Sequence, residues 1–268
     1  MGVRTIITKT RHFFRRTQRF CAAALRLLRQ GCHFAAKGAG RLWILFWRAA
    51  IILTAKFLSG ASVRWITLEP DPPARLSPSE AEEWKRREKE KEDEPCQRVY
   101  FANHTSHLDS IVIWTVLPER ERRNTRMVAA YDYWTAGPFR RFLSRKVFNA
   151  LLIDRKHVSF RNNPVNQILK EMGTDHSIII FPEGGRGNGD QINEFKSGIY
   201  HIAKKRPELE LIPIYLDNMN RILPRGNVFP VPMLSRIVFG PPIWIENGEQ
   251  KEAFLARCRE AVLKLKDL

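Results

Sequence analysis

A histidine and an aspartate five residues apart are the side chains in this chain best suited to catalysis. His104 and Asp109 lie in the segment Asn-His-Thr-Ser-His-Leu-Asp, residues 103–109. Residues five apart in one helix do not face each other, so the pair can meet only if His104 lies in a turn and Asp109 in the first turn of a following helix. The aspartate would then orient the imidazole, and the histidine could take a proton from a hydroxyl. The alternative is a pair that only caps the helix.

A glycine-rich segment further along the chain carries groups suited to binding a phosphate. It reads Phe-Pro-Glu-Gly-Gly-Arg-Gly, residues 181–187. Arg186 can hold a phosphate through two parallel hydrogen bonds, and Gly184 and Gly185 let backbone amides approach the same group. Glu183 would hold the free hydroxyl of an acceptor or stabilise Arg186. For each cation the alternative is an ordinary surface ion pair.

Strands and helices alternate from residue 98 onwards, which predicts an α/β fold with a mostly parallel mixed sheet flanked by helices. Strands are expected at 98–102, 126–130, 150–153, 177–181, 210–215 and 236–239, and helices at 107–117, 137–147, 163–172, 195–205 and 249–266.

The expected strands bring the polar residues to one edge of the sheet. His104 follows the first strand, Arg155 the third, and the glycine-rich segment the fourth. Ligands bind at the carboxyl ends of strands in open α/β sheets, so we expect these groups to converge. Arg155 would be a second phosphate ligand and Lys196 a third.

These segments resemble the conserved blocks of the glycerolipid acyltransferases, the family that contains the 1-acylglycerol-3-phosphate acyltransferases. Four blocks occur in the family's order: Asn-His-x-Ser-x-x-Asp at 103–109, Leu-Ile-Asp-Arg at 152–155, Phe-Pro-Glu-Gly-x-Arg at 181–186 and Leu-Ile-Pro-Ile at 211–214. The resemblance covers roughly residues 97 to 245, and four ordered blocks are a specific signal.

The resemblance implies an acyltransferase that moves a fatty acyl group from a thioester to the free hydroxyl of lysophosphatidate. The product would be phosphatidate, for phospholipid synthesis. His104 and Asp109 would form the catalytic pair, and Glu183, Gly184, Gly185, Arg186, Arg155 and Lys196 the substrate-binding set. The reaction needs no metal and no cofactor; acyl-CoA or acyl carrier protein is the co-substrate.

Departures from the family pattern leave the acceptor open. Most members that acylate lysophosphatidate have Glu-Gly-Thr-Arg-Ser where this chain has Glu-Gly-Gly-Arg-Gly, residues 183–187. That sequence and His107 are closer to the branch that acylates glycerol-3-phosphate, while the second block and the short chain are closer to the lysophosphatidate branch. Glycerol-3-phosphate or another lysophospholipid is therefore the alternative acceptor.

Other classes of function fit the residues less well. An inactive membrane-binding module with the same fold is the non-enzymatic alternative, against which the intact catalytic and glycine-rich segments argue. A metal site could be formed by His104, His107, Asp109 and Glu183, but it would leave Arg186 without a role. The Gly-x-Ser-x-Gly segment of many serine hydrolases does not occur.

The basic character of the chain is concentrated at its N-terminal end. The net charge is +17, and residues 1–68 contain 13 of the 45 Lys and Arg residues and no Asp or Glu. Leu, Phe and Trp are interleaved with these cations, a pattern that favours an anionic membrane surface over a nucleic-acid groove. We therefore expect a lipid membrane as partner, and no nucleic acid.

The most apolar stretch of this arm, residues 42–58, is expected to form a helix that lies in the membrane interface. Its 17 residues are at the short limit for crossing a bilayer, and they include Arg48 and Lys56. A helical wheel places both on one side with Arg41, so this basic stripe would face the headgroups of the cytoplasmic leaflet. The alternative is an amphipathic helix that packs on the protein's own core. The apolar run begins too late for a signal peptide.

The sequence therefore predicts three regions. Residues 1–68 form a membrane-associated helical arm, 69–96 a charged linker or insertion, and 97–268 the α/β acyltransferase domain on the cytoplasmic side of the membrane. The four cysteines are scattered, which favours free thiols.

Overall fold

The structure is a computed structural model that describes residues 40–66, 97–154, 163–189, 191–222 and 234–268. The chain divides into two compact units. The larger contains Ile52–Tyr131 and Ala150–Leu268, and the smaller contains Met1–Ile51 and Asp132–Asn149. The sheet belongs to the larger unit, as do all the predicted site residues that the structure describes.

A mostly parallel mixed sheet forms the larger unit, as the sequence predicts. The strands of the described residues are β1 (Ser62–Trp65), β2 (Arg98–Ala102), β3 (Thr125–Ala130), β4 (Leu151–Ile153), β5 (Ser177–Ile180), β6 (Glu210–Asp217) and β7 (Arg236–Phe239). They lie in the order β1-β7-β6-β2-β5-β3-β4. Every neighbouring pair is parallel except β6 and β7. The carboxyl ends of β2, β5 and β6 therefore lie at the same edge.

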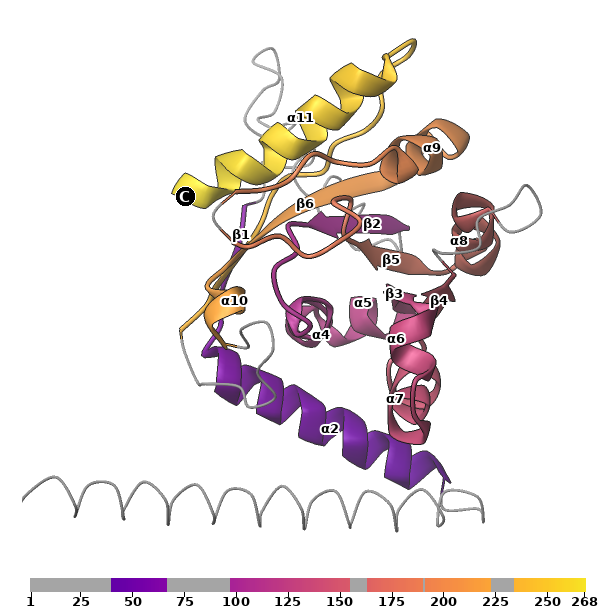
Figure 1. Ribbon diagram of the computed structural model, residues 1–268, viewed down its shortest axis with the longest axis vertical. Helices are drawn as coiled ribbons and strands as arrows, with labels where there is room; N and C mark the ends of the chain where they lie inside the picture. The colour runs from indigo at the N-terminus through magenta and orange to yellow at the C-terminus, as the bar shows by residue number, and fades with distance from the viewer. Residues whose placement is uncertain (1–39, 67–96, 155–162, 190, 223–233) are drawn as a thin grey trace, which may run out of the picture. The chain divides into compact units, whose positions relative to one another are not determined.

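Helices separate most of these strands along the chain (Figure 1). They are α2 (Gly40–Ser59), α4 (Asp109–Val116), α5 (Glu119–Asn124), α6 (Tyr131–Thr135), α7 (Pro138–Phe142), α8 (Pro164–Met172), α9 (Gly198–Lys205), α10 (Met219–Ile222) and α11 (Lys251–Lys264), with a π-helix at Leu143–Val147 and a 3-10 turn at Leu265–Asp267.

Helices cover both faces of the sheet. Val99 and Phe101 of β2 belong to the core that α8, α9 and α11 share, while Tyr100 between them is buried on the opposite face. Side chains alternate along a strand, so each central strand has two apolar faces to bury. Figure 1 shows α9 and α11 on one side of β2, and α4 and α5 on the other. This double burial explains why the all-apolar run at β5 could be predicted from the sequence.

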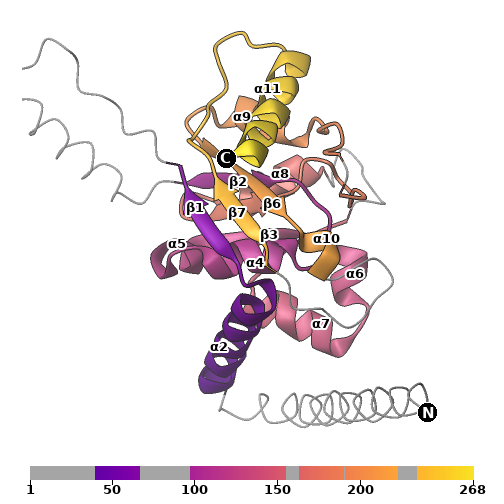
Figure 2. The same cartoon turned by 90° about the vertical axis from the view of Figure 1, so that its left-hand side faces the viewer.

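Three differences from the predicted elements have physical causes. The strand β1 was not predicted, because its four residues are all exposed and show no buried pattern. It nevertheless pairs with β7 at the edge of the sheet (Figure 2), and its Trp65 ring stacks on Phe239 at 3.8 Å. The helix expected at 137–147 is instead the short α7 followed by the π-helix. The helices α5, α6 and α10 are too short to show a helical period.

In the smaller unit, the first turns of α2 pack against α7 and the π-helix. The Trp47 ring meets Phe139 edge-on at 5.9 Å, and Arg48 Nε donates to the Val147 carbonyl at 2.9 Å. Arg48 therefore does not belong to a basic stripe that faces outwards, and that prediction is wrong at this position. The helical wheel counted charge alone, whereas the neighbouring tryptophan decides which side of the helix packs.

The exposed side of α2 carries apolar residues as well as the cations Arg41 and Lys56. Leu42, Leu45 and Phe46 are 77, 56 and 57% exposed. No helix in the described ranges is long and apolar enough to cross a lipid bilayer.

Candidate active site

The predicted contact between His104 and Asp109 is present. Both lie at the β2–α4 junction, His104 in the loop and Asp109 at the first residue of α4, and His104 Nδ1 is 2.8 Å from Asp109 Oδ2. The backbone amides of Thr105 and Ser106 donate to the same oxygen at 2.7 and 2.8 Å. An ionised carboxylate only accepts hydrogen bonds, so Nδ1 carries the imidazole proton and Nε2 is left with a free lone pair.

Burial fixes the aspartate and leaves the histidine accessible. The side chain of Asp109 is 0% exposed, and that of His104 is 21% exposed. The start of α4 adds the partial positive charge of a helix N-terminus beside the carboxylate. The imidazole also stacks on the Phe181 ring, with centroids 4.1 Å apart and planes inclined by 18°. Together these contacts hold one ring orientation with an open edge, the geometry that a general base requires.

Glu183 connects the glycine-rich segment to residues 103–108, the loop between β2 and α4 that holds His104 and is called the catalytic loop below. Its Oε1 accepts from the backbone amide of His104 at 2.7 Å, and its Oε2 accepts from the backbone and side-chain amides of Asn193 at 3.1 and 2.7 Å. The residue is only 6% exposed. Both carboxylate oxygens are thus used within the protein, which suits a role in positioning His104. Sequence reasoning missed Asn193 and the stacking role of Phe181, because neither forms a recognisable pattern with His104.

The glycine-rich turn is more exposed to solvent than the catalytic loop. Gly184 has φ +69° and is exposed, and a Cβ at this position would lie 2.7 Å from Lys196 Cδ and 3.0 Å from its Nζ. A Cβ at Gly185 would meet nothing within 4 Å. The turn is joined to the catalytic loop by a 2.7 Å hydrogen bond from the Gly187 amide to the His104 carbonyl. The Gly184 amide already donates to the Phe181 carbonyl at 3.0 Å, so the nearby Lys196 ammonium, rather than this amide, is suited to binding an anion.

The structure brings most of the predicted site residues together. Hydrogen bonds link His104 to Asp109 and Glu183, and Lys196 lies over Gly184. Gly185 and the half-exposed Arg186 follow in the same turn. Arg155 lies outside the described residues, so its predicted role as a phosphate ligand stays a prediction.

Comparisons with known proteins find similarity to acyltransferases. A sequence model of the acyltransferase family matches residues 85–217. The chain is 23% identical over 155 residues to a 1-acyl-sn-glycerol-3-phosphate acyltransferase of Cocos nucifera, covering 58% of this chain and 48% of that protein. It is 24% identical over 112 residues to the Haemophilus influenzae protein of the same name, covering 39% and 42%.

A third relative and a solved structure extend the similarity. A taffazin of Dictyostelium discoideum is 26% identical over 149 residues, covering 51% of this chain and 50% of that protein. The crystal structure of the 1-acyl-sn-glycerophosphate acyltransferase PlsC from Thermotoga maritima matches with a TM-score of 0.58 at 15% identity, covering 90% of this chain and 94% of that one. The structural match supports the fold. The chain spans about half the length of the curated relatives it matches.

Residues 85–217 of the chain therefore resemble the acyltransferase family. Two of the relatives, those of Cocos nucifera and Haemophilus influenzae, are acyltransferases of 1-acyl-sn-glycerol-3-phosphate by the names they bear.

Proposed function

We propose that the protein is a membrane-associated O-acyltransferase that transfers a fatty acyl group from a thioester to lysophosphatidate, giving phosphatidate. The observation that carries the proposal is the 2.8 Å contact between His104 Nδ1 and the buried Asp109, beside a glycine-rich turn in an acyltransferase-family domain. No metal or cofactor takes part, and the donor is acyl-CoA or acyl carrier protein.

His104 acts as the general base. Its Nε2 accepts the proton of the acceptor hydroxyl as that oxygen attacks the thioester carbonyl, while the charge of Asp109 stabilises the imidazolium. The new C–O bond forms and the C–S bond breaks. The imidazolium then returns the proton to the leaving thiolate, so the enzyme is regenerated with no acyl-enzyme intermediate.

The glycine-rich turn holds the phosphate of the acceptor. Arg186 supplies a guanidinium that can bind two phosphate oxygens, and Lys196 supplies a compact charge over Gly184. Glycerol-3-phosphate carries the same phosphate and is the competing acceptor, favoured by the Glu-Gly-Gly-Arg sequence. Lysophosphatidate is preferred because two of the relatives are named for it.

The exposed side of α2 attaches the protein to the membrane, with the acyltransferase domain on the cytoplasmic side. Leu42, Leu45 and Phe46 lie outward, as apolar residues do that enter the boundary between headgroups and acyl chains. Replacing these three residues with serine should lower the fraction that floats with vesicles after a high-salt wash. Leu234→Ser, at an apolar residue that is 78% exposed elsewhere on the protein, is the matched control. Equal flotation of both variants and the wild type would refute this role for α2.

The acyltransferase proposal is tested by product identification. The purified chain in mixed micelles is incubated with radiolabelled acyl-CoA and one acceptor at a time: lysophosphatidate, glycerol-3-phosphate, or lysophosphatidylcholine. We expect labelled phosphatidate from the first. If glycerol-3-phosphate instead gives labelled lysophosphatidate, glycerol-3-phosphate is favoured as the acceptor. Release of free fatty acid alone would contradict acyl transfer.

A further inference from the structure

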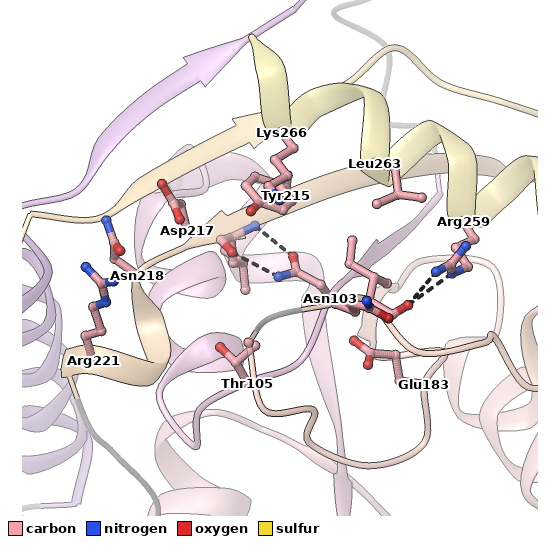
Figure 3. Close-up of a pocket in the computed structure, with 14 residues that line it drawn as sticks. Asn103, Thr105, Glu183, Tyr215, Asp217, Asn218, Arg221, Arg259, Leu263 and Lys266 are labelled. Carbon is pink, nitrogen blue, oxygen red and sulfur yellow. Dashed lines mark hydrogen bonds between the residues drawn. The ribbon is translucent and has the colours of Figure 1, made fainter.

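A cavity of about 330 Å³ lies beside the catalytic loop, between the end of β6 and the C-terminal helical segment (Figure 3). Thr105 and Glu183 contribute to its wall, although His104 and Arg186 do not. The other lining residues include three cations: Arg221, Arg259 and Lys266.

Among the described lining residues, three cations outnumber two carboxylates. Neither Arg221 nor Lys266 has an ion-pair partner among the described residues. Arg259 donates from Nε and Nη2 to the neutral Ile192 carbonyl at 3.1 and 2.8 Å, and it forms no ion pair with a carboxylate in the part of the chain that the structure describes.

Both carboxylates in the wall have cationic or N–H partners of their own. Glu183 accepts hydrogen bonds from His104 and Asn193, and Asp217 Oδ2 lies 3.9 Å from an Arg236 nitrogen. The excess of positive charge makes the cavity suited to an anion.

The wall of the cavity also contains neutral hydrogen-bond donors. Burial, with the nearby Asp217 charge, raises the pKa of the Tyr215 phenol, so the hydroxyl keeps its proton and can donate to an anion. Figure 3 shows Tyr215 below the Lys266 side chain, with Asn218 and Arg221 at the far end of the cavity. A phosphate has several acceptor oxygens, which match a wall of ammonium, guanidinium and hydroxyl groups.

The cavity adjoins the glycine-rich segment but does not include the groups assigned to the acceptor phosphate. Glu183 and residues 189, 191 and 192 line one part of it and the end of β6 lines another, whereas Gly184, Arg186 and Lys196 do not line it. A reaction of two substrates needs two binding regions that meet at the base on the loop after β2. The turn serves the acceptor, so the cavity is left for the second substrate.

We propose that this cavity binds the phosphate-bearing part of the thioester donor, an assignment that rests on the proposed acyltransferase function. The phosphopantetheine phosphate is common to acyl-CoA and acyl carrier protein. The volume is at the lower end for ligand pockets, enough for a phosphate and its neighbouring groups but not for a whole coenzyme.

The test compares donors with and without phosphates. Calorimetry on the full chain in micelles measures binding of CoA and of pantetheine, which lacks the phosphates. The variants are Lys266→Gln alone and Arg221→Gln with Lys266→Gln; neither change removes an ion pair that the described residues form. Lys264→Gln is the matched control, because Lys264 is exposed nearby in α11 and pairs with Glu260.

We expect the double variant to bind CoA ~10-fold more weakly, with pantetheine binding unchanged and the control equal to the wild type. The KM for acyl-CoA should rise by the same factor, and the KM for lysophosphatidate should not. Unchanged CoA binding in both variants would overturn the proposal, as would an effect on the lysophosphatidate KM alone. Weakened CoA binding in a protein without acyl transfer would uphold the cavity and refute the proposed reaction.

Discussion

The catalytic loop and the glycine-rich turn lie at the ends of neighbouring strands, yet they are built in opposite ways. The loop is fixed: three donors meet one oxygen of the buried Asp109, and Glu183 holds the backbone of His104. The turn is open: Gly184 and Gly185 are exposed. The difference separates two tasks, because proton transfer needs one fixed geometry while binding a phosphate needs accessible donors.

If the loop is fixed for proton transfer, loss of the Asp109 charge should have a larger effect than any change in the turn. Asp109→Asn should lower kcat by about 10²–10³-fold, because the imidazolium loses its stabilising charge. Steady-state kinetics with circular dichroism checks this. Asp175→Asn, at an exposed loop residue, should behave as the wild type. A folded Asp109→Asn enzyme with normal kcat would remove the distinction between loop and turn.

The connection through Glu183 should have the next largest effect. Asn193→Ala removes the 2.7 Å hydrogen bond to Glu183 Oε2, so the His104 backbone is held less firmly. We expect kcat to fall ~10-fold with both KM values unchanged, and Asn193→Asp to be worse because two carboxylates would then face each other.

A control for this position is its exposed neighbour, through Glu194→Ala. If Asn193 served only in folding, its variants would lose thermal stability and active protein in proportion. The kcat of the active fraction would then not differ between Asn193→Ala and Asn193→Asp. An increase in the acceptor KM would instead place Asn193 in the binding turn.

The open turn should respond through binding rather than through the chemical step. Arg186→Lys keeps the charge but loses the planar pair of donors, so the KM for lysophosphatidate should rise ~10-fold while kcat and the KM for acyl-CoA change little. Arg145→Lys, at an exposed arginine of the smaller unit, is the control. A rise in the acyl-CoA KM alone would assign Arg186 to the donor.

The smallest effect is expected on thermal stability, at an ion pair outside the catalytic loop and the glycine-rich turn. The hydrogen bond from Arg257 lowers the pKa of Glu249, so the folded pKa lies below the unfolded value of about 4.3. The pair therefore stabilises the protein above that pH, and the contribution is lost as the pH falls through the folded pKa.

Thermal unfolding of Glu249→Gln measures this contribution. The Tm should be about 2 °C below the wild type at pH 7, and the difference should shrink progressively as the pH falls below about 4.3, with kcat unchanged at neutral pH. A Tm difference that stays constant as the pH is lowered through the acid range would exclude the charge as its cause.

The sequence predicted the parts of the site that depend on local order. The five-residue spacing of His104 and Asp109 excludes a common helix face, so a turn had to bring them together, and the structure has that turn. The run at β5 was predictable because it is buried on both sides.

The parts that depend on distant contacts could not be predicted. Asn193 reaches Glu183 only through the fold of an irregular segment, and β1 is exposed along its length. The cations of the cavity come from α10 and the C-terminal segment, which no local pattern relates to the catalytic loop.

The most direct test of the account is acyl transfer by the wild type and by His104→Ala under the same conditions. Labelled acyl-CoA and lysophosphatidate are incubated with each protein, phosphatidate is quantified by mass spectrometry, and circular dichroism confirms equal folding. We predict labelled phosphatidate from the wild type, and a rate at least about 10²-fold lower from the variant, because His104 is the imidazole that Asp109 orients. Turnover near the wild-type rate in a folded His104→Ala protein would contradict the mechanism.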